Sequence, residues 1–396
     1  MPRSLSAACF NAALFLLPLT ACQSDDDVDL GPAADCLVKA SARNGEIIEG
    51  SYIVTYAPDV ALPNAPNARV AAQTPLVAVE QMLRLNRVEA EAVTVLGTGP
   101  ETMFSATLSP SDLARLQQDP AVLSVEQDQI MSICNCVDVA TTATLSWNIS
   151  GTGFGRGDRQ NGKTVWVIDT GIDLDHPDLN VDRNRSISFL TGKTADDESG
   201  HGTHVAGIIG ALNNGFGVTG IASGATLVSL RVLDAEGDGK VSTILQAINH
   251  VFRNGQPGDV VNMSLGGEGV SSSLERAIRQ TADRGIFFTI AAGNEKMAVA
   301  GLSPARVDHR NVFTVSAMDR NEQYASFSNY GPEVDICAYG VRIPSTYKDG
   351  RYATLSGTSM AAPHVAGLLY IRGASLPTRG YVKNDPDGKA DAIARE

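Results

Sequence analysis

Between residues 138 and 375 the sequence alternates short apolar runs with segments of helical character. The apolar runs cover 164–168, 226–232, 260–263, 287–291 and 312–315. Alternation of this kind favours a mainly parallel β-sheet with helices on both faces, a three-layer α/β/α fold. Ligands of such sheets bind beyond the carboxyl ends of the strands, so the functional residues are expected there.

A second, smaller folded region is predicted over residues 50–131. Strands are expected at 52–56, 92–96, 104–108 and 121–126, and helices at 74–87 and from Ser109 to 118. The second helix begins with an N-cap serine and a proline at its first position. The order βαββαβ is that of a ferredoxin-like α+β sandwich. A chain of 396 residues has room for both regions.

The first 22 residues have the layout of an export signal: Arg3, an apolar segment and small residues before Cys22. The run Leu19–Cys22 resembles the lipobox of bacterial lipoproteins, which implies a lipid on Cys22, a polar linker over 23–49 and a place in the bacterial cell envelope. Gln23 suggests the outer membrane. The alternative is an ordinary cleaved signal and a secreted protein. Beyond Cys22 no apolar stretch is long enough to span a bilayer, which excludes a multi-pass membrane protein.

The charge balance argues against one class of partner. With Lys+Arg 31 against Asp+Glu 44, the formal net charge is −13, which argues against a nucleic-acid partner.

Four cysteines remain beyond the predicted leader. In an oxidising compartment Cys36, Cys134, Cys136 and Cys337 allow three disulfide pairings, and these stay open. One suggestion is Cys36 with Cys134 and Cys136 with Cys337. A metal site at Cys134 and Cys136 is less favoured, because no suitably spaced His or Cys follows.

One motif points to nucleotide binding but lacks the required context. Residues 157–164 match the phosphate-binding pattern GxxxxGK[ST]. That mechanism needs a helix directly after the motif, so that the helix N-terminus faces the phosphates. Here a strand-like run follows from Thr164, which favours an ordinary turn over an ATP site.

Four further segments carry residues suited to nucleophilic catalysis. Asp169 ends the first strand of the large region, and Asn294 follows another strand. Ser359 lies at a glycine turn that opens a helix, and His201 near the start of a second helix, with His204 one turn later. Each segment taken alone also has a structural explanation, such as capping or packing.

Together and in this order, the four segments resemble the subtilisin-like serine proteases, from about Trp147 to Gly367. The run 326–331, Ser-Phe-Ser-Asn-Tyr-Gly, resembles the proteinase-K-like branch. The resemblance implies that Ser359 is the nucleophile, and it selects His201 rather than His204 as the base. Asp169 would orient the imidazole and Asn294 would donate to the oxyanion. His204 is then expected to pack or hydrogen-bond structurally.

The same resemblance implies substrate contacts and a structural calcium ion. Ser264, Leu265 and Gly266 on one side, and Gly237, Asp238 and Gly239 on the other, would pair with an extended peptide, while 296–304 would form the pocket floor. Calcium would be held by the side chains of Asp178 and Asn214 and by the carbonyls of Leu212, Phe216 and Val218. The family's N-terminal glutamine ligand has no clear counterpart among residues 140–145.

Residues 50–131 resemble the subtilase propeptide, which assists folding and then blocks the cleft. The expected protein is an exported serine endopeptidase acting on polypeptides, made as a precursor that cuts itself between Glu126 and Thr142, with a peptidase domain at 138–375 and a tail at 376–396. The alternative is a catalytically inactive binding protein with the same fold. A nucleotide-binding protein built on residues 157–164 has less support.

Overall fold

The computed structural model describes residues 41–57, 75–98, 101–133, the backbone of 136–140, and residues 146–152 and 162–395. All of them belong to one compact unit, Val38–Glu396. The predicted leader, Cys22 and Cys36 lie outside the described residues, as do Cys134 and most of the 157–164 motif. In the part that is described, no helix is long and apolar enough to cross a membrane.

The N-terminal region forms an antiparallel sheet with two helices, in the order that the sequence predicts. Its elements are β1 Ile47–Tyr56, α1 Pro75–Leu85, β2 Glu91–Thr98, β3 Thr102–Thr107, α2 Pro110–Leu116 and β4 Val122–Ser132. The sheet order is β2-β3-β1-β4, and β9 (Asp238–Lys240) pairs with β4 at its edge. β4 runs beyond its predicted end at Glu126 because its last residues pair with β9.

The large region is built on a sheet in the order β16-β17-β13-β12-β11-β10-β6-β8-β7. Apart from the antiparallel pair of β16 and β17, all of its strand pairs are parallel. The strands are β6 Thr164–Asp169, β7 Ile187–Ser188, β8 Thr226–Arg231, β10 Val260–Met263, β11 Phe287–Ala291, β12 Val312–Met318, β13 Ile336–Tyr339, β16 Thr378–Tyr381 and β17 Ala392–Ala394. Because Thr164 enters β6, no helix follows the phosphate-binding pattern.

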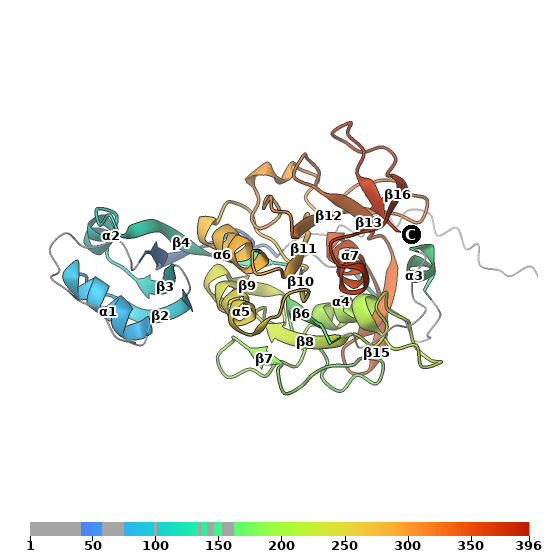
Figure 1. The fold of residues 1–396 in the computed structure, drawn as a ribbon, viewed down its shortest axis with the longest axis horizontal. Helices are drawn as coiled ribbons and strands as arrows, with labels where there is room; N and C mark the ends of the chain where they lie inside the picture. The colour runs from blue at the N-terminus through green and yellow to red at the C-terminus, as the bar shows by residue number, and fades with distance from the viewer. Residues whose placement is uncertain are drawn as a thin grey trace, which may run out of the picture. The chain divides into compact units, whose positions relative to one another are not determined.

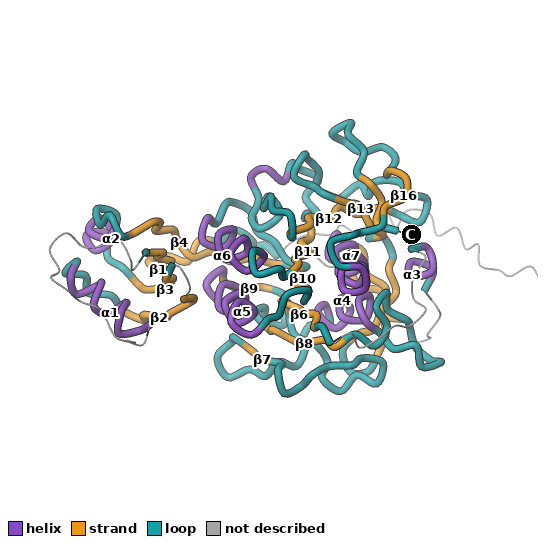
Figure 2. Tube along the Cα trace, in the orientation of Figure 1, coloured by secondary structure: helices purple, strands orange, loops and turns teal. Residues whose placement is uncertain are grey.

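Helices cover both faces of this sheet (Figures 1 and 2). The helices α4 His201–Gly210 and α7 Thr358–Arg372 pack on one face, and α5 Val241–Asn254 and α6 Ser272–Ala282 on the other. Alternation along β6 explains the arrangement: Val165 and Val167 join the first core, whereas Trp166 and Ile168 join the second. The remaining elements are α3 Trp147–Gly151, the 3₁₀ turn Val299–Gly301, and a small sheet of β14 Ile343–Tyr347, β15 Arg351–Ser356 and β5 Cys136–Ala140.

The N-terminal sheet packs against α5 and α6. Ile53, Leu96 and Met103 belong to the same hydrophobic cluster as the apolar residues of these helices. Two carboxylates of β4 then cap the helices. Glu126 accepts from Ser271 Oγ at 2.6 Å and Ser272 N at 3.0 Å at the start of α6, and Asp128 accepts from Ser242 N at 3.1 Å at the start of α5. Helix N-termini favour such partners because their N–H groups lack intrahelical acceptors.

Residues 376–396, predicted as a C-terminal tail, contribute β17 to the large sheet, where it pairs with β13 and buries Ile393. One suggestion needs correction. Cys337 is a buried free thiol, so the suggested bridge to Cys136 is wrong.

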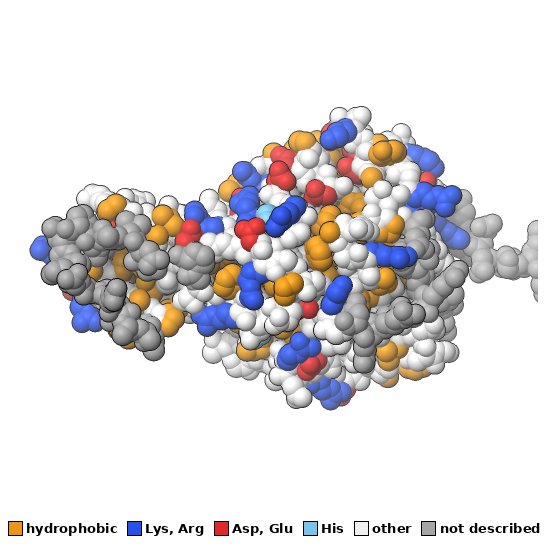
Figure 3. All heavy atoms as spheres, viewed as in Figure 1, with side chains coloured by type: hydrophobic (Ala, Val, Ile, Leu, Met, Phe, Trp, Pro, Cys, Tyr) orange, Lys and Arg blue, Asp and Glu red, His pale blue; other side chains and the backbone are white. Residues whose placement is uncertain are grey.

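On the face shown in Figure 3, acidic and basic side chains are interspersed over the described surface.

Candidate active site

Asp169 and His201 meet where β6 ends and α4 begins. His201 Nδ1 lies 2.7 Å from Asp169 Oδ1, and both side chains are fully buried. The approach depends on Gly202, because a Cβ at that position would lie 2.0 Å from the carbonyl oxygen of Gly171. The helix can therefore contact the strand end closely enough for the imidazole to reach the carboxylate.

A polar network fixes this junction. Thr170 N donates to Asp169 Oδ1 at 2.7 Å, and Thr170 Oγ1 accepts from Gly202 N at 3.0 Å and donates to Asp197 Oδ1 at 2.9 Å. Asp197 Oδ2 in turn accepts from Thr203 N and Thr203 Oγ1, which caps the helix. Thr170 and Asp197 were not among the predicted site residues, although an aspartate just before the helix is a typical capping signal.

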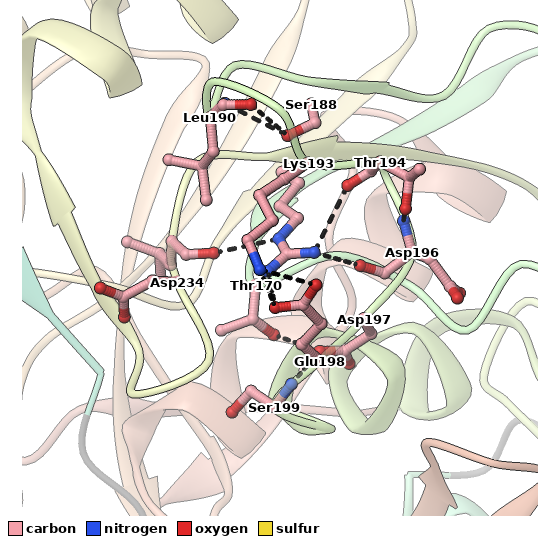
Figure 4. Close-up of polar contacts among 12 residues, drawn as sticks. Thr170, Ser188, Leu190, Lys193, Thr194, Asp196, Asp197, Glu198, Ser199 and Asp234 are labelled. Atoms are coloured by element: carbon pink, nitrogen blue, oxygen red, sulfur yellow. Dashed lines mark hydrogen bonds and ion pairs between the residues drawn. The ribbon is translucent and has the colours of Figure 1, made fainter.

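Polar contacts hold the loop that leads into α4, with Lys193, Thr194, Asp196 and Glu198 labelled in Figure 4. Arg231 is fully buried at the end of β8 and donates to the carbonyl oxygens of Thr194 and Asp196, the latter at 2.8 Å. Its guanidinium forms an ion pair with Glu198 at 3.0 Å. Hydrogen bonds from Arg231 and Lys193 lower the pKa of Glu198 to about 2. The loop therefore keeps these contacts throughout the neutral range.

The hydrogen bond to Asp169 sets the tautomer of His201. A carboxylate only accepts, so Nδ1 carries the proton and Nε2 of the neutral ring is an acceptor. Nε2 is buried and has no hydrogen-bond partner among the described residues. His201 Nε2 is therefore available to accept a proton from a group that approaches it.

Ser359 is the second residue of α7 and is almost fully buried. Its hydroxyl donates to the carbonyl oxygen of Ser264 at 3.2 Å, and Ser264 Oγ donates back to Ser359 O at 2.8 Å. Ser359 makes no hydrogen bond to His201 Nε2, since its hydroxyl donates to Ser264 O instead. Asp169 and His201 are thus hydrogen-bonded to each other, whereas the Ser359 hydroxyl is bonded to Ser264 rather than to His201.

Asn294 follows β11, and the oxygen of its side-chain amide is anchored by hydrogen bonds. Its Oδ1 accepts from Thr358 N at 2.8 Å and from Thr358 Oγ1 at 3.0 Å, at the start of α7. The oxygen is therefore occupied, and Nδ2 is the end that can donate to another group. Asn294 and Ser359 line the same pocket.

That pocket lies at the carboxyl ends of β10 and β11. Leu302 and Ser303, from the segment expected to form its floor, do line it, together with Ala305. The other lining residues are Asn44, Ser132, Ile133, Ser264, Leu265, Gly266, Gly267, Glu268, Ala291, Ala292, Gly293, Asn294, Glu295, Thr358 and Ser359. Backbone and small side chains dominate, so the pocket can admit a side chain.

The end of β4 runs through the cleft as an extended peptide. Ser132 pairs antiparallel with Asp238 on one side and with Gly266 on the other, and Ile133 N donates to Gly237 O at 3.1 Å. Gly237 must lack a side chain, since a Cβ there would lie 2.3 Å from Ile133 Cγ1. The predicted substrate-binding residues Gly237, Asp238, Gly239 and Gly266 thus hold a segment of this same chain.

Comparison with known proteins identifies the family. A model described as "Subtilase family" matches residues 160–371. The chain is 40% identical to a "Thermostable alkaline protease" of Halalkalibacterium halodurans, over 71% of this chain and 74% of that protein. The chain belongs to the subtilase family. It is a subtilisin-like serine protease, and polypeptides are its substrates.

Further relatives agree with this assignment. "Subtilisin Savinase" of Lederbergia lenta is 44% identical, over 61% of this chain and 91% of its own. A solved "cold adapted subtilisin-like serine proteinase" is 33% identical with a TM-score of 0.53, covering 65% of this chain and 92% of that one. The predicted subtilisin-like α/β fold is therefore confirmed.

In this subtilase the expected calcium residues lie together around one carboxylate. Asp178 is fully buried, and its oxygens accept from Asn214 Nδ2 at 2.9 Å, Val218 N at 3.0 Å and the Tyr352 hydroxyl at 3.2 Å. Leu212 N donates to Asp178 O at 2.9 Å, and Phe216 lies exposed on the same loop. Burial raises the pKa of the Asp178 carboxyl. The described residues contain no group of three His, Cys, Asp or Glu side chains suited to a metal.

The second histidine of α4 has a structural place, as predicted. His204 Nε2 lies 3.0 Å from Ile343 O and 3.1 Å from Ala353 O. Burial lowers the pKa of His204 to about 3, so the ring is neutral at physiological pH. It therefore ties α4 to the small β14–β15 sheet.

Proposed function

We propose that this subtilase is an endopeptidase that works through Asp169, His201 and Ser359, with Asn294 in the oxyanion hole, and that it is made as a self-cleaving precursor. The observation that carries the proposal is the strand Ile130–Ile133. It lies between Gly237–Lys240 and Gly266 in the extended, doubly paired form expected of a bound substrate. The run Ser326–Gly331 further supports a place in the proteinase-K-like branch.

The proposed chemistry follows from the hydrogen bonds at the site. Ser359 Oγ turns from Ser264 O to His201 Nε2, which takes its proton as the hydroxyl attacks the peptide carbonyl. Asp169 stabilises the imidazolium through Nδ1. Asn294 Nδ2 donates to the oxyanion, together with the backbone N–H of Ser359 at the start of α7. His201 then returns the proton to the leaving amine as the C–N bond breaks. A water molecule, deprotonated by the same imidazole, hydrolyses the acyl-enzyme and restores the Ser359 hydroxyl.

The position of the self-cleavage follows from the pairing on both sides of Ser359. Ile133 is bound to Gly237, whereas Cys136 pairs with Ser356, three residues before the serine. The pairings of Ile133 and Cys136 therefore bracket Ser359. We infer that the precursor is cut after Ile133 and before Cys136, within the predicted stretch 126–142. Intact mass of wild type and Ser359→Ala tests this, since only wild type should split.

Release of the cleaved N-terminal part is expected to be favoured by rising pH. Burial raises the pKa of Glu126 and Asp128 in the complex, above the ordinary values they regain in water. Binding therefore takes up protons, so it is tightest below the ordinary pKa values and weakens as pH rises through the raised ones. Size-exclusion chromatography of the cleaved complex should show more fragment retained at pH 4 than at pH 8.

The matched variant is the double change Glu126→Gln and Asp128→Asn. It removes both titrating groups and keeps side chains of the same size, so retention should depend less on pH than in wild type. Equal retention of the wild-type fragment at both pH values would contradict the predicted release.

We also propose one structural calcium ion at Asp178, Asn214 and the carbonyls of Leu212, Phe216 and Val218. The buried carboxylate has no Lys or Arg ion pair among the described residues, and its raised pKa indicates that a cation would stabilise it. The donor set is all oxygen, as calcium requires, once the Asn214 amide turns its Oδ1 toward Asp178.

Removal of calcium is expected to destabilise the mature enzyme. Binding at a hundred times Kd contributes about 2.7 kcal/mol, so EDTA should lower Tm by roughly 5–10 °C for a domain of this size. Differential scanning calorimetry in calcium and in EDTA measures the effect. Asp178→Asn should have a low Tm in both buffers. If the wild-type Tm is the same in calcium and in EDTA, the calcium proposal is wrong.

Export and lipid anchoring rest on the sequence of the leader alone. We propose that Cys22 carries a lipid and that the precursor is held at the bacterial cell envelope. Because the proposed cut lies after Ile133, the anchor would stay on the N-terminal fragment. The peptidase would then remain attached through non-covalent contacts, which include the β4 pairing, the two helix caps and the packing of the N-terminal sheet on α5 and α6. It would be secreted when these contacts open.

A further inference from the structure

The carboxylate of Asp238 meets two hydroxyl groups in the cleft. Its Oδ1 accepts from Ser132 Oγ at 2.5 Å, and its Oδ2 accepts from Ser41 Oγ at 2.9 Å, with Arg43 NH1 3.9 Å away. Asp238 is only 5% exposed. The side chains that contact the Asp238 carboxylate are therefore all hydrogen-bond donors or cations.

The strand register places the Ser132 side chain on the same face as Asp238. The two residues are directly opposed in the antiparallel pair β4–β9, and opposed side chains lie on one face. On its other side Ser132 faces Gly266, which has no side chain. Asp238 is thus the group that can distinguish one side chain from another at this position.

The carboxylate is held in place by its own turn. Asp238 N donates to Asp234 Oδ1 at 2.9 Å, and Asp234 N donates to Asp238 O at 2.9 Å. Glu236 N donates to the same Asp234 oxygen at 3.1 Å. The turn therefore presents a fixed acceptor with two further acids beside it, a preorganised site that costs little ordering when a peptide binds.

We propose that Asp238 is a specificity-determining residue of this peptidase. At the position taken by Ser132, it selects peptides with a hydrogen-bond donor, above all Ser or Thr, over apolar residues and most strongly over acidic ones. An ionised carboxylate only accepts hydrogen bonds and repels a second negative charge. The inference rests on the proposed function, since it takes the cleft occupied by β4 as the substrate site.

Release of the N-terminal part would leave this acceptor open. Ser41, Arg43 and Ser132 all precede the proposed cut, so they leave with the same fragment. The Asp238 carboxylate then regains both oxygens for an incoming peptide. The preference therefore applies to substrates cleaved in trans, where it can be measured.

The test uses the mature enzyme and internally quenched peptides that copy residues 128–140, with Ser, Thr, Ala or Asp in place of Ser132. For wild type, kcat/KM should fall about tenfold from Ser to Ala, the factor that ~1.4 kcal/mol gives, and further for Asp. Thr should resemble Ser. With Asp238→Asn, the ratio of Ser to Ala should shrink to about twofold and the penalty for Asp should nearly vanish.

Glu236→Gln is the matched control. It removes a neighbouring exposed charge without touching Ser132, so the ratio of Ser to Ala should stay as in wild type. If wild type and Asp238→Asn cleave all peptides with the same ratios, the inference is wrong and the proposed function stands. If folded wild type cleaves neither these peptides nor casein, the proposed function fails and the inference falls with it.

Discussion

Replacing Ser359 by alanine is expected to leave the precursor whole and to lower peptide hydrolysis by about 10⁶-fold, the size of loss found for this residue type in subtilisin. His201 Nε2 is already set as a proton acceptor by the bond between Nδ1 and Asp169. Without the hydroxyl, no atom at this site attacks the peptide carbonyl. The loss of a single oxygen should therefore remove both cleavage in trans and self-cleavage.

Intact mass and fluorophosphonate labelling of parallel preparations measure both effects. Wild type should give a fragment ending between residues 133 and 136 and should take up the label, whereas Ser359→Ala should do neither. Ser150→Ala, an exposed serine on α3, is the matched control and should behave as wild type. Cleavage of Ser359→Ala alone in pure buffer would contradict self-processing by this serine.

Other outcomes would separate the alternatives. If both chains stay whole while wild type takes the label, the enzyme is a serine hydrolase that another protease matures. If wild type neither splits nor takes the label, the catalytic role of Ser359 is wrong, and the inactive binding protein becomes the better account.

The residues proposed for catalysis could be found from the sequence because each sits in a local pattern. Asp169 ends one buried strand and Asn294 follows another, while His201 and Ser359 lie at helix starts beside glycines. Such patterns depend on a few neighbours in the chain, and the strand–helix alternation gives the parallel sheet for the same reason. The direction of the Ser359 hydroxyl could not be predicted, because it depends on Ser264, a distant residue.

Contacts between distant segments explain the rest of what was missed. Glu126 ends the last predicted strand of the N-terminal region and Asp128 lies beyond it, in the predicted cleavage stretch. Only the docking of β4 brings them to the helix starts of α6 and α5. The burial of Arg231 likewise depends on carbonyls of the loop before α4. The β17 strand is short, so its place in the sheet comes from pairing with β13 rather than from its own pattern.

Asn294→Leu is expected to lower kcat by about 10²–10³-fold with little change in KM. The change keeps the size of the side chain and removes Nδ2, the donor that the contacts of Oδ1 with Thr358 leave available. A donor to the oxyanion acts on a charge that exists only in the transition state, so its loss should appear in kcat. Steady-state kinetics of the mature variant on one peptide give both constants.

Thr358→Val is the matched control for this prediction. It removes the hydroxyl that donates to Asn294 Oδ1 and keeps the Thr358 N–H, so the amide stays anchored and kcat should fall by less than about tenfold. A larger loss in Thr358→Val than in Asn294→Leu would mean that the anchor at the start of α7 matters more than the donor. If Asn294→Leu instead raises KM and leaves kcat unchanged, Asn294 binds the substrate in its ground state and the oxyanion role is wrong.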